Sequence, residues 1–225
     1  METTTVAFYI GPFGITSIVI TTWGIMLVLG IFCWLATRNL SLEPGPVQTL
    51  LEGIVSACEA AIQSVLPGHA RELLPFIATL WIYIVIANLT GLIPLLHSPT
   101  GNLSVTAGLA LLVFMSVHWF GIHQNGIHQY LKHYLRPMPL LLPFHLISEA
   151  TRTIALAVRL FGNIMSLELV ALLVLLVAGL LVPIPLLMLH IVEALVQAYI
   201  FGMLALIYVA GAMQSQHSKK ENNHE

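Results

Sequence analysis

The sequence has 225 residues, of which 58% are hydrophobic and 8% are charged. A soluble domain carries about 25% charged residues, so this composition excludes a water-soluble enzyme and a disordered segment. Ten acidic residues, all Glu, outnumber eight Lys and Arg residues, which leaves no basic surface for nucleic acid. What remains is a protein that crosses a membrane several times.

Neither the start of the chain nor its cysteines suggest processing or redox chemistry. The first residues, METTTVAFYIGPFG, lack a basic segment and an A-x-A-like cleavage site, so we expect no cleaved signal peptide. Cys33 and Cys58 have no CxxC spacing and no metal-ligand cluster around them. We interpret both as packing residues and expect no metal and no cofactor.

Long apolar stretches follow one another along the chain. A helix needs about 20 apolar residues to cross a bilayer core of about 30 Å. On this basis we expect membrane helices at residues 13–36, 74–96, 103–122, 146–182 and 186–213. The predicted fold is an all-α integral membrane protein with a single membrane domain, residues 1–225.

The stretch 42–66 has a different pattern. One helical face carries its polar residues, Gln48, Glu52, Glu59 and Gln63, while apolar residues lie away from that face. We therefore expect an amphipathic helix at the membrane surface.

The basic residues predict the orientation, because Lys and Arg accumulate on the cytoplasmic side. Six of the eight flank helix ends that alternate to one side: Arg38, Arg71, Lys132, Arg136, Lys219 and Lys220. The uncharged loop 97–102 and the turn at Pro183 lie on the other side. We expect the N-terminus outside and the C-terminus in the cytoplasm.

The fourth predicted span is too long to stand upright. Its 37 residues, 146–182, would form a helix of roughly 55 Å. We expect it and the last span to be steeply tilted, and this helix to wrap around a partner outside the chain.

Arg159 is the clearest functional candidate, because ionisable groups at membrane depth are costly. No acidic residue lies three or four positions away from it. At 100° per residue, five polar residues fall within about 40° of Arg159: His145, Ser148, Arg152, Asn163 and Ser166. We expect Arg159 to face a carboxylate of another chain. The alternative is an ion pair with Glu168, on the opposite face, or with Glu193.

Arg152 has a simpler alternative reading. It lies near the start of its helix, so its side chain could reach the membrane surface.

The last span carries a second polar row. His190, Glu193 and Gln197 share one face, and Tyr208 lies on the same line. Such groups can hold water and exchange protons, and His and Glu titrate near neutral pH in suitable surroundings. The alternative for Gln197 alone is a hydrogen bond between helices.

The histidines at 118, 123, 128 and 133 recur every five residues. Five residues turn a helix by about 140° beyond a full turn, so these side chains share no face. Since metal sites use other spacings, we favour the interfacial end of the third span over a metal site.

Three motifs carry a resemblance to a known family. They are RLFGN at 159–163 followed by Glu168, His190 and Gln197; NLTGLIP at 88–94; and NLSVT at 102–106. From about residue 70 onward the chain resembles subunit a of the F-type ATP synthase, in the membrane Fo sector. The resemblance implies a non-catalytic stator subunit beside a rotating ring of c subunits, with ATP chemistry on other chains. No GxxxxGK[ST] motif is present.

The resemblance also implies roles for individual residues. Arg159 would face the c-ring carboxylate, make it release its ion, and block direct passage between two half-channels. The positions of Asn163, Glu168, His190 and Gln197 match those of aqueous half-channels, chiefly the outer one, and Glu193 would be an added carboxylate there. An inner half-channel would involve His145, Ser148, Glu149 and Arg152. The family often has Asp at the position of Asn102 and Glu at that of His145, where Glu149 is a nearby substitute.

The implied partners are the c ring, the peripheral-stalk b subunits, the rest of the ATP synthase and membrane lipid. The implied cargo is protons, with sodium ions as the alternative, and the implied location is a bacterial plasma (inner) membrane. A self-contained cation/proton transporter is a competing hypothesis, although the two halves of the chain show no repeat. A purely structural membrane anchor would have no use for the polar residues at depth.

Overall fold

The computed structural model of the protein describes residues 6–10, 13–38, 45–93, 98–126, 142–178 and 183–214. A short antiparallel hairpin comes first, with β1 at Val6–Ile10 and β2 at Phe13–Thr16. The α-helices are α1 Ser17–Arg38, α2 Pro46–Val65, α3 Ala70–Leu89, α4 Leu103–Asn125, α6 Leu142–Ala178 and α7 Pro183–Gln214. Two 3-10 turns, η1 Thr90–Leu92 and η2 Pro99–Gly101, lie between α3 and α4.

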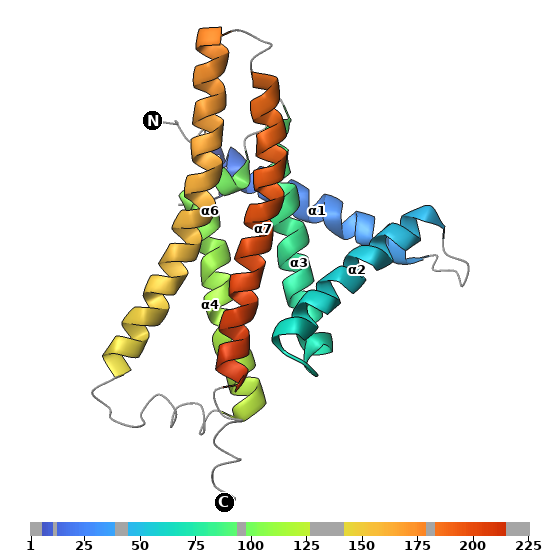
Figure 1. Cartoon of the computed structure of the whole chain (residues 1–225). Coiled ribbons are helices and arrows are strands. Elements are labelled where there is room, and N and C mark those ends of the chain that lie inside the picture. Colours follow the sequence, from blue (N-terminus) through green and yellow to red (C-terminus); the bar gives the residue numbers. More distant parts are fainter. Residues whose placement is uncertain are drawn as a thin grey trace, which may run out of the picture.

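Five helices are long and apolar enough to cross a membrane: α1, α3 with η1, α4, α6 and α7. The predicted all-α membrane fold is thereby confirmed. The hairpin was not anticipated, and α1 begins at Ser17 rather than at 13 because residues 13–16 pair with β1. The predicted tilt of α6 and α7 relative to a membrane stays a prediction. Figure 1 shows α6 running obliquely to α4 and α7 in its first half and beside α7 in its second.

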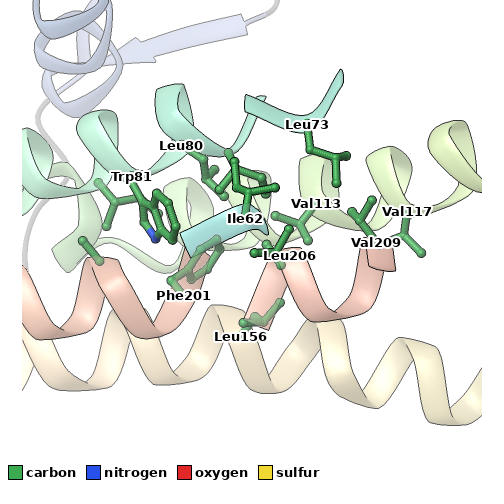
Figure 2. Packing of buried hydrophobic residues seen from close by; sticks show 14 of the residues in the cluster. Ile62, Leu73, Leu80, Trp81, Val113, Val117, Leu156, Phe201, Leu206 and Val209 are labelled. Carbon is green, nitrogen blue, oxygen red and sulfur yellow. The ribbon is translucent and has the colours of Figure 1, made fainter. Parts of the chain in front are cut away.

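The core lies where α3, α4, α6 and α7 meet, as Figure 2 shows. Its largest side chains include Ile62 of α2, Leu73, Leu80 and Trp81 of α3, Val113 of α4, Leu156 of α6, and Phe201 and Leu206 of α7. α7 thus packs between α3 on one side and α4 with α6 on the other. This packing fixes the two helices that carry the candidate site.

Helices α3 and α7 come very close at Gly202. The indole Nε1 of Trp81 donates a hydrogen bond to the backbone oxygen of Tyr199 at 3.3 Å. The indole ring of Trp81 also stacks on the phenol ring of Tyr199. A Cβ atom at Gly202 would overlap the indole ring of Trp81. Glycine at this position therefore permits the contact.

Helix α2 has the predicted amphipathic character. Cys58 and Ile62 are buried, and the helix packs on α3. On the outer face, Gln48 donates to Glu52 at 2.8 Å and Gln63 donates to Glu59 at 3.2 Å. Burial raises the pKa of the Cys58 thiol, which favours the unreactive protonated form and fits a packing role.

Helix α1 is the least integrated span. None of its residues is buried, and its contacts are divided among α3, β2 and η2. A largely apolar groove of about 840 Å³ separates it from α3 and α4, lined among others by Met26, Cys33, Phe76, Tyr83 and Leu109.

Candidate functional site

Arg159 lies on an exposed face of α6. The neighbouring residues Leu156, Leu160 and Ile164 are buried and hold the helix against the core. Among the residues that the structure describes, Arg159 makes no hydrogen bond or ion pair, so the alternative pairing with Glu168 or Glu193 finds no support. The guanidinium of Arg159 is therefore exposed on the side of α6 next to the one that packs against the core.

The stripe around Arg159 is small and polar. Ser148, Arg152, Ala155 and Ser166 are exposed like Arg159 itself, while Gly162 and Asn163 are half-buried. The helical spacing thus predicted a face that the structure leaves uncovered. The backbone of His145 belongs to α6, but its side chain lies outside the described residues.

A hydrogen bond joins α6 to α7 one turn beyond Arg159. The side-chain amide of Asn163 donates to Oε1 of Gln197 at 2.7 Å. Gln197 is 2% exposed, and its Nε2 is buried with no hydrogen-bond partner among the described residues. Gln197 therefore forms the bond between helices that was its alternative interpretation, and among the described residues its second amide hydrogen has no acceptor.

The Glu168 carboxylate lies against two glycines on the opposite side of α6. The backbone N–H of Ser98 donates to its Oε1 at 3.3 Å. A Cβ atom would lie 3.1 Å from Oε1 if added at Gly91, and 3.2 Å from Oε2 if added at Gly101. The absence of side chains at these two positions leaves the space that the carboxylate occupies.

His190 of α7 is buried next to this carboxylate. Its Nε2 is 3.2 Å from the backbone oxygen of Asn88, and its Cε1 would be 3.7 Å from a Cβ at Gly91. The same hypothetical Cβ contacts Glu168, so the imidazole and the carboxylate border a common space. The sequence pattern singled out each of the two residues but did not predict that they would border the same space.

A chain of buried polar groups surrounds His190. Asn88 donates through Nδ2 to the backbone oxygen of Ala194 at 3.2 Å and accepts from the Thr100 hydroxyl at 2.7 Å. Thr100 lies 2.6 Å from the Ser98 hydroxyl, which donates to Ala87 at 2.9 Å. Sequence reasoning gave these residues no role, and only the polarity of residues 88–90 and 98–102 in an apolar chain signals them.

Glu193 is half-buried on α7 between His190 and Gln197. No hydrogen bond or ion pair joins Glu193 to another described residue.

Arg152 and Tyr208 meet at the other end of α6 and α7. The guanidinium carbon lies 5.4 Å from the centre of the Tyr208 ring, so the arginine packs on an aromatic face although it remains exposed. A cavity of about 30 Å³ adjoins this pair, lined by Val113, Phe114, Val117, Glu149, Arg152, Thr153, Leu156 and Tyr208. Its size suits a single water molecule.

Of the four repeated histidines, the structure describes His118 and His123. Nδ1 of His118 is 2.9 Å from the backbone oxygen of Phe114, and His123 is exposed. His128 and His133 lie outside the described residues. In the part of the chain that is described, no three residues of the types His, Cys, Asp and Glu gather closely enough to hold a metal.

Comparison with known proteins identifies the family. Residues 19–210 match the model of the ATP synthase A chain. The chain belongs to the ATP synthase subunit a family. It is 62% identical to ATP synthase subunit a 2 of Pelobacter propionicus, over 100% of this chain and 99% of that protein.

Other relatives of subunit a are similar along nearly their whole length. Identity is 64% to ATP synthase subunit a 1 of Hahella chejuensis, over 94% of this chain and 90% of the relative. It is 59% to ATP synthase subunit a of Legionella pneumophila (strain Corby), over 96% and 94%. The resemblance drawn from the motifs is thus confirmed, and the five apolar helices agree with an integral membrane subunit.

Proposed function

We propose that this chain is the ion-translocating stator subunit of the ATP synthase membrane sector, with Arg159 facing the carboxylate of a c-subunit ring. The observation that carries the proposal is the exposed guanidinium, which has no partner among the described residues. An arginine at membrane depth costs several kcal/mol unless it is paired or hydrated. A carboxylate moving past α6 would supply that partner.

The neighbours of Arg159 support a moving contact. Ala155 and Ser166 on the same face are small and exposed, so another helix can come close. Because a guanidinium stays protonated at all physiological pH values, it would stabilise the ionised carboxylate and make it release its proton.

Two half-channels on either side of Arg159 complete the proposal. Along α6, Glu168 lies nine residues after Arg159 and Arg152 seven before it, which corresponds to roughly 13 Å and 10 Å of helix rise. The outer group comprises Asn163, Glu168, His190, Glu193 and Gln197, and the inner group comprises His145, Ser148, Glu149 and Arg152. A proton would enter one group, ride on the ring, and leave by the other.

The partners follow from the family. The relatives are named as subunits of ATP synthase, and we infer assembly with its c ring, its b subunits and its remaining subunits. The chain itself would be non-catalytic. We infer a bacterial plasma membrane, with the N-terminus outside and the C-terminus in the cytoplasm, and protons as the coupling ion.

Replacement of Arg159 tests this function. In membrane vesicles that contain the whole complex, Arg159→Ala should abolish ATP-driven proton pumping, because the ring carboxylate would no longer be forced to release its proton. Arg38→Ala is the control, since it removes an exposed arginine at the end of α1 that belongs to neither half-channel group, and it should retain most of the pumping.

Normal coupled pumping by Arg159→Ala would rule the proposal out. The secondary-transporter alternative makes a different prediction. It requires the purified chain alone, reconstituted in vesicles without other ATP synthase subunits, to exchange cations for protons.

A further inference from the structure

The buried oxygen of Asn88 determines which nitrogen of His190 carries a proton. Asn88 lies in the last turn of α3, and its backbone oxygen accepts from the N–H of Thr90, the residue that caps the helix. A carbonyl oxygen has two lone pairs, so it can accept a second hydrogen bond. The Asn88 carbonyl accepts a hydrogen bond from Nε2 of His190. A carbonyl oxygen can only accept, so Nε2 bears the hydrogen and the neutral ring has its lone pair at Nδ1.

The second ring nitrogen, Nδ1, accepts no hydrogen bond from any residue that the structure describes. The titratable groups around it are Glu168 from α6 and Glu193 from α7, while the described parts of α3, η1 and η2 that pack here contribute neutral groups. The imidazole thus offers a base to the space that it shares with the Glu168 carboxylate.

The side chain of Asn88 fixes the position of its own carbonyl. It is fully buried and binds α7 at Ala194 and η2 at Thr100. Ala194 is one turn along α7 from His190. The side-chain amide of Asn88, by binding Ala194, therefore fixes where the Asn88 carbonyl lies relative to the imidazole of His190. Ser98, which donates to Glu168, belongs to the same cluster through Thr100.

We propose that Asn88, supported by Thr100, is a positioning residue of the outer half-channel that keeps His190 in the Nε2–H form with Nδ1 as its proton-accepting atom. This inference rests on the proposed function. A proton that arrives through water binds Nδ1 and forms the imidazolium. The imidazolium then passes that proton through water to Glu168 and returns to the same neutral form.

Matched substitutions at Thr100 and Asn88 test the proposal in the whole ATP synthase in proteoliposomes. ATP synthesis would be driven by an imposed proton gradient and measured as a function of pH on the outer side. Thr100→Val removes the hydroxyl at nearly constant shape, and Asn88→Ala removes the amide. Thr100→Val should lower the rate by roughly fivefold, the effect of about one lost hydrogen bond, and Asn88→Ala, which removes two, should lower it further. Both variants should alter the dependence on outer pH. Thr100→Ser should restore the natural rate and the natural pH dependence.

A double-mutant cycle with His190→Ala separates positioning from general support of the fold. If Asn88 and Thr100 act through His190, Thr100→Val and Asn88→Ala should add little to the loss already caused by His190→Ala. Additive losses, or an unchanged pH profile in the single variants, would overturn the proposal. Should Asn88→Ala not assemble, Thr100→Val carries the test.

The outcomes are distinguishable from failure of the proposed function. If that function is wrong, Arg159→Ala will pump normally, whatever happens at Asn88. If only the present inference is wrong, Arg159→Ala will be inactive while the effects at Thr100 and His190 are independent.

Discussion

A single glycine sets how closely α3 and α7 approach. The indole of Trp81 occupies the space that a side chain at Gly202 would need, and it bonds to the backbone of Tyr199. Helix α3 carries Asn88, and α7 carries His190 and Gln197. The contact between Trp81 and Gly202 therefore helps to set the distance between the two helices that carry these polar residues. A position far from any charge therefore contributes to the geometry of the candidate site.

Gly202→Ala should destabilise the assembled protein by about 1–3 kcal/mol, because the extra methyl forces the indole or a helix to move. Thermal unfolding of the purified complex in detergent would measure the change. Gly211→Ala is the control in the same helix, since a Cβ there meets no atom within 4 Å, and it should be neutral or slightly stabilising. Equal stability of the two variants would contradict the close contact.

Helix α6 carries charged residues on two opposite sides along its 37 residues. One side carries Arg152 and Arg159 in the open. The other places Glu168 against η2 and α3, where backbone groups and glycines receive it. The buried residues between these sides hold α6 on α4 and α7, so the arginines stay exposed without loosening the helix.

The stack of Arg152 on Tyr208 links α6 to α7 near the proposed inner half-channel. Tyr208→Leu should cost about 0.5–1 kcal/mol, the usual worth of an exposed cation–π contact. It should also open the small cavity beside Glu149, which would appear as proton leakage through the inner path. Tyr208→Phe keeps the aromatic face and should behave like the natural protein in both thermal unfolding and vesicle leak measurements. Loss of stability in Tyr208→Phe would instead show that the hydroxyl matters.

The molecule as a whole consists of a packed bundle and a helix that stands apart from it. α3 and α7 are deeply buried, whereas α1 contributes no buried residue. The proposed orientation of this assembly in the membrane rests on the positions of its basic residues, and labelling can test it.

Single cysteines at the two ends of α4 should react with a membrane-impermeant maleimide from opposite sides. In a background in which Cys33 and Cys58 are replaced by serine, Ser104→Cys should be labelled from outside and Gln124→Cys only after the cytoplasmic side is opened. Both positions are exposed, so burial would not hide either one. The reverse pattern would invert the proposed topology.

The sequence predicted those features that are properties of a single helix. Apolar length gave the five spans, and helical periodicity gave the face around Arg159. It could not predict contacts between separate elements, because periodicity defines a face but not its neighbour. Tyr208 lies on the His190 line, yet it meets Arg152 at the far end. Asn88 and Thr100 bond across 12 residues, and Asn88 and His190 across 102.

The exposure of Arg159 also bears on the life of the chain before assembly. Until a partner covers it, the guanidinium has to draw water and lipid headgroups toward the bilayer interior, at a cost of about 2.5–3.5 kcal/mol. A subunit that has not assembled is then less stable, unfolds locally more often and is degraded faster by proteases. We therefore expect its half-life in a pulse-chase experiment to lengthen when the c subunits are co-produced. In Arg159→Leu, the half-life should no longer depend on the c subunits. A half-life indifferent to the partner would show that the orphan arginine is already satisfied by lipid and water.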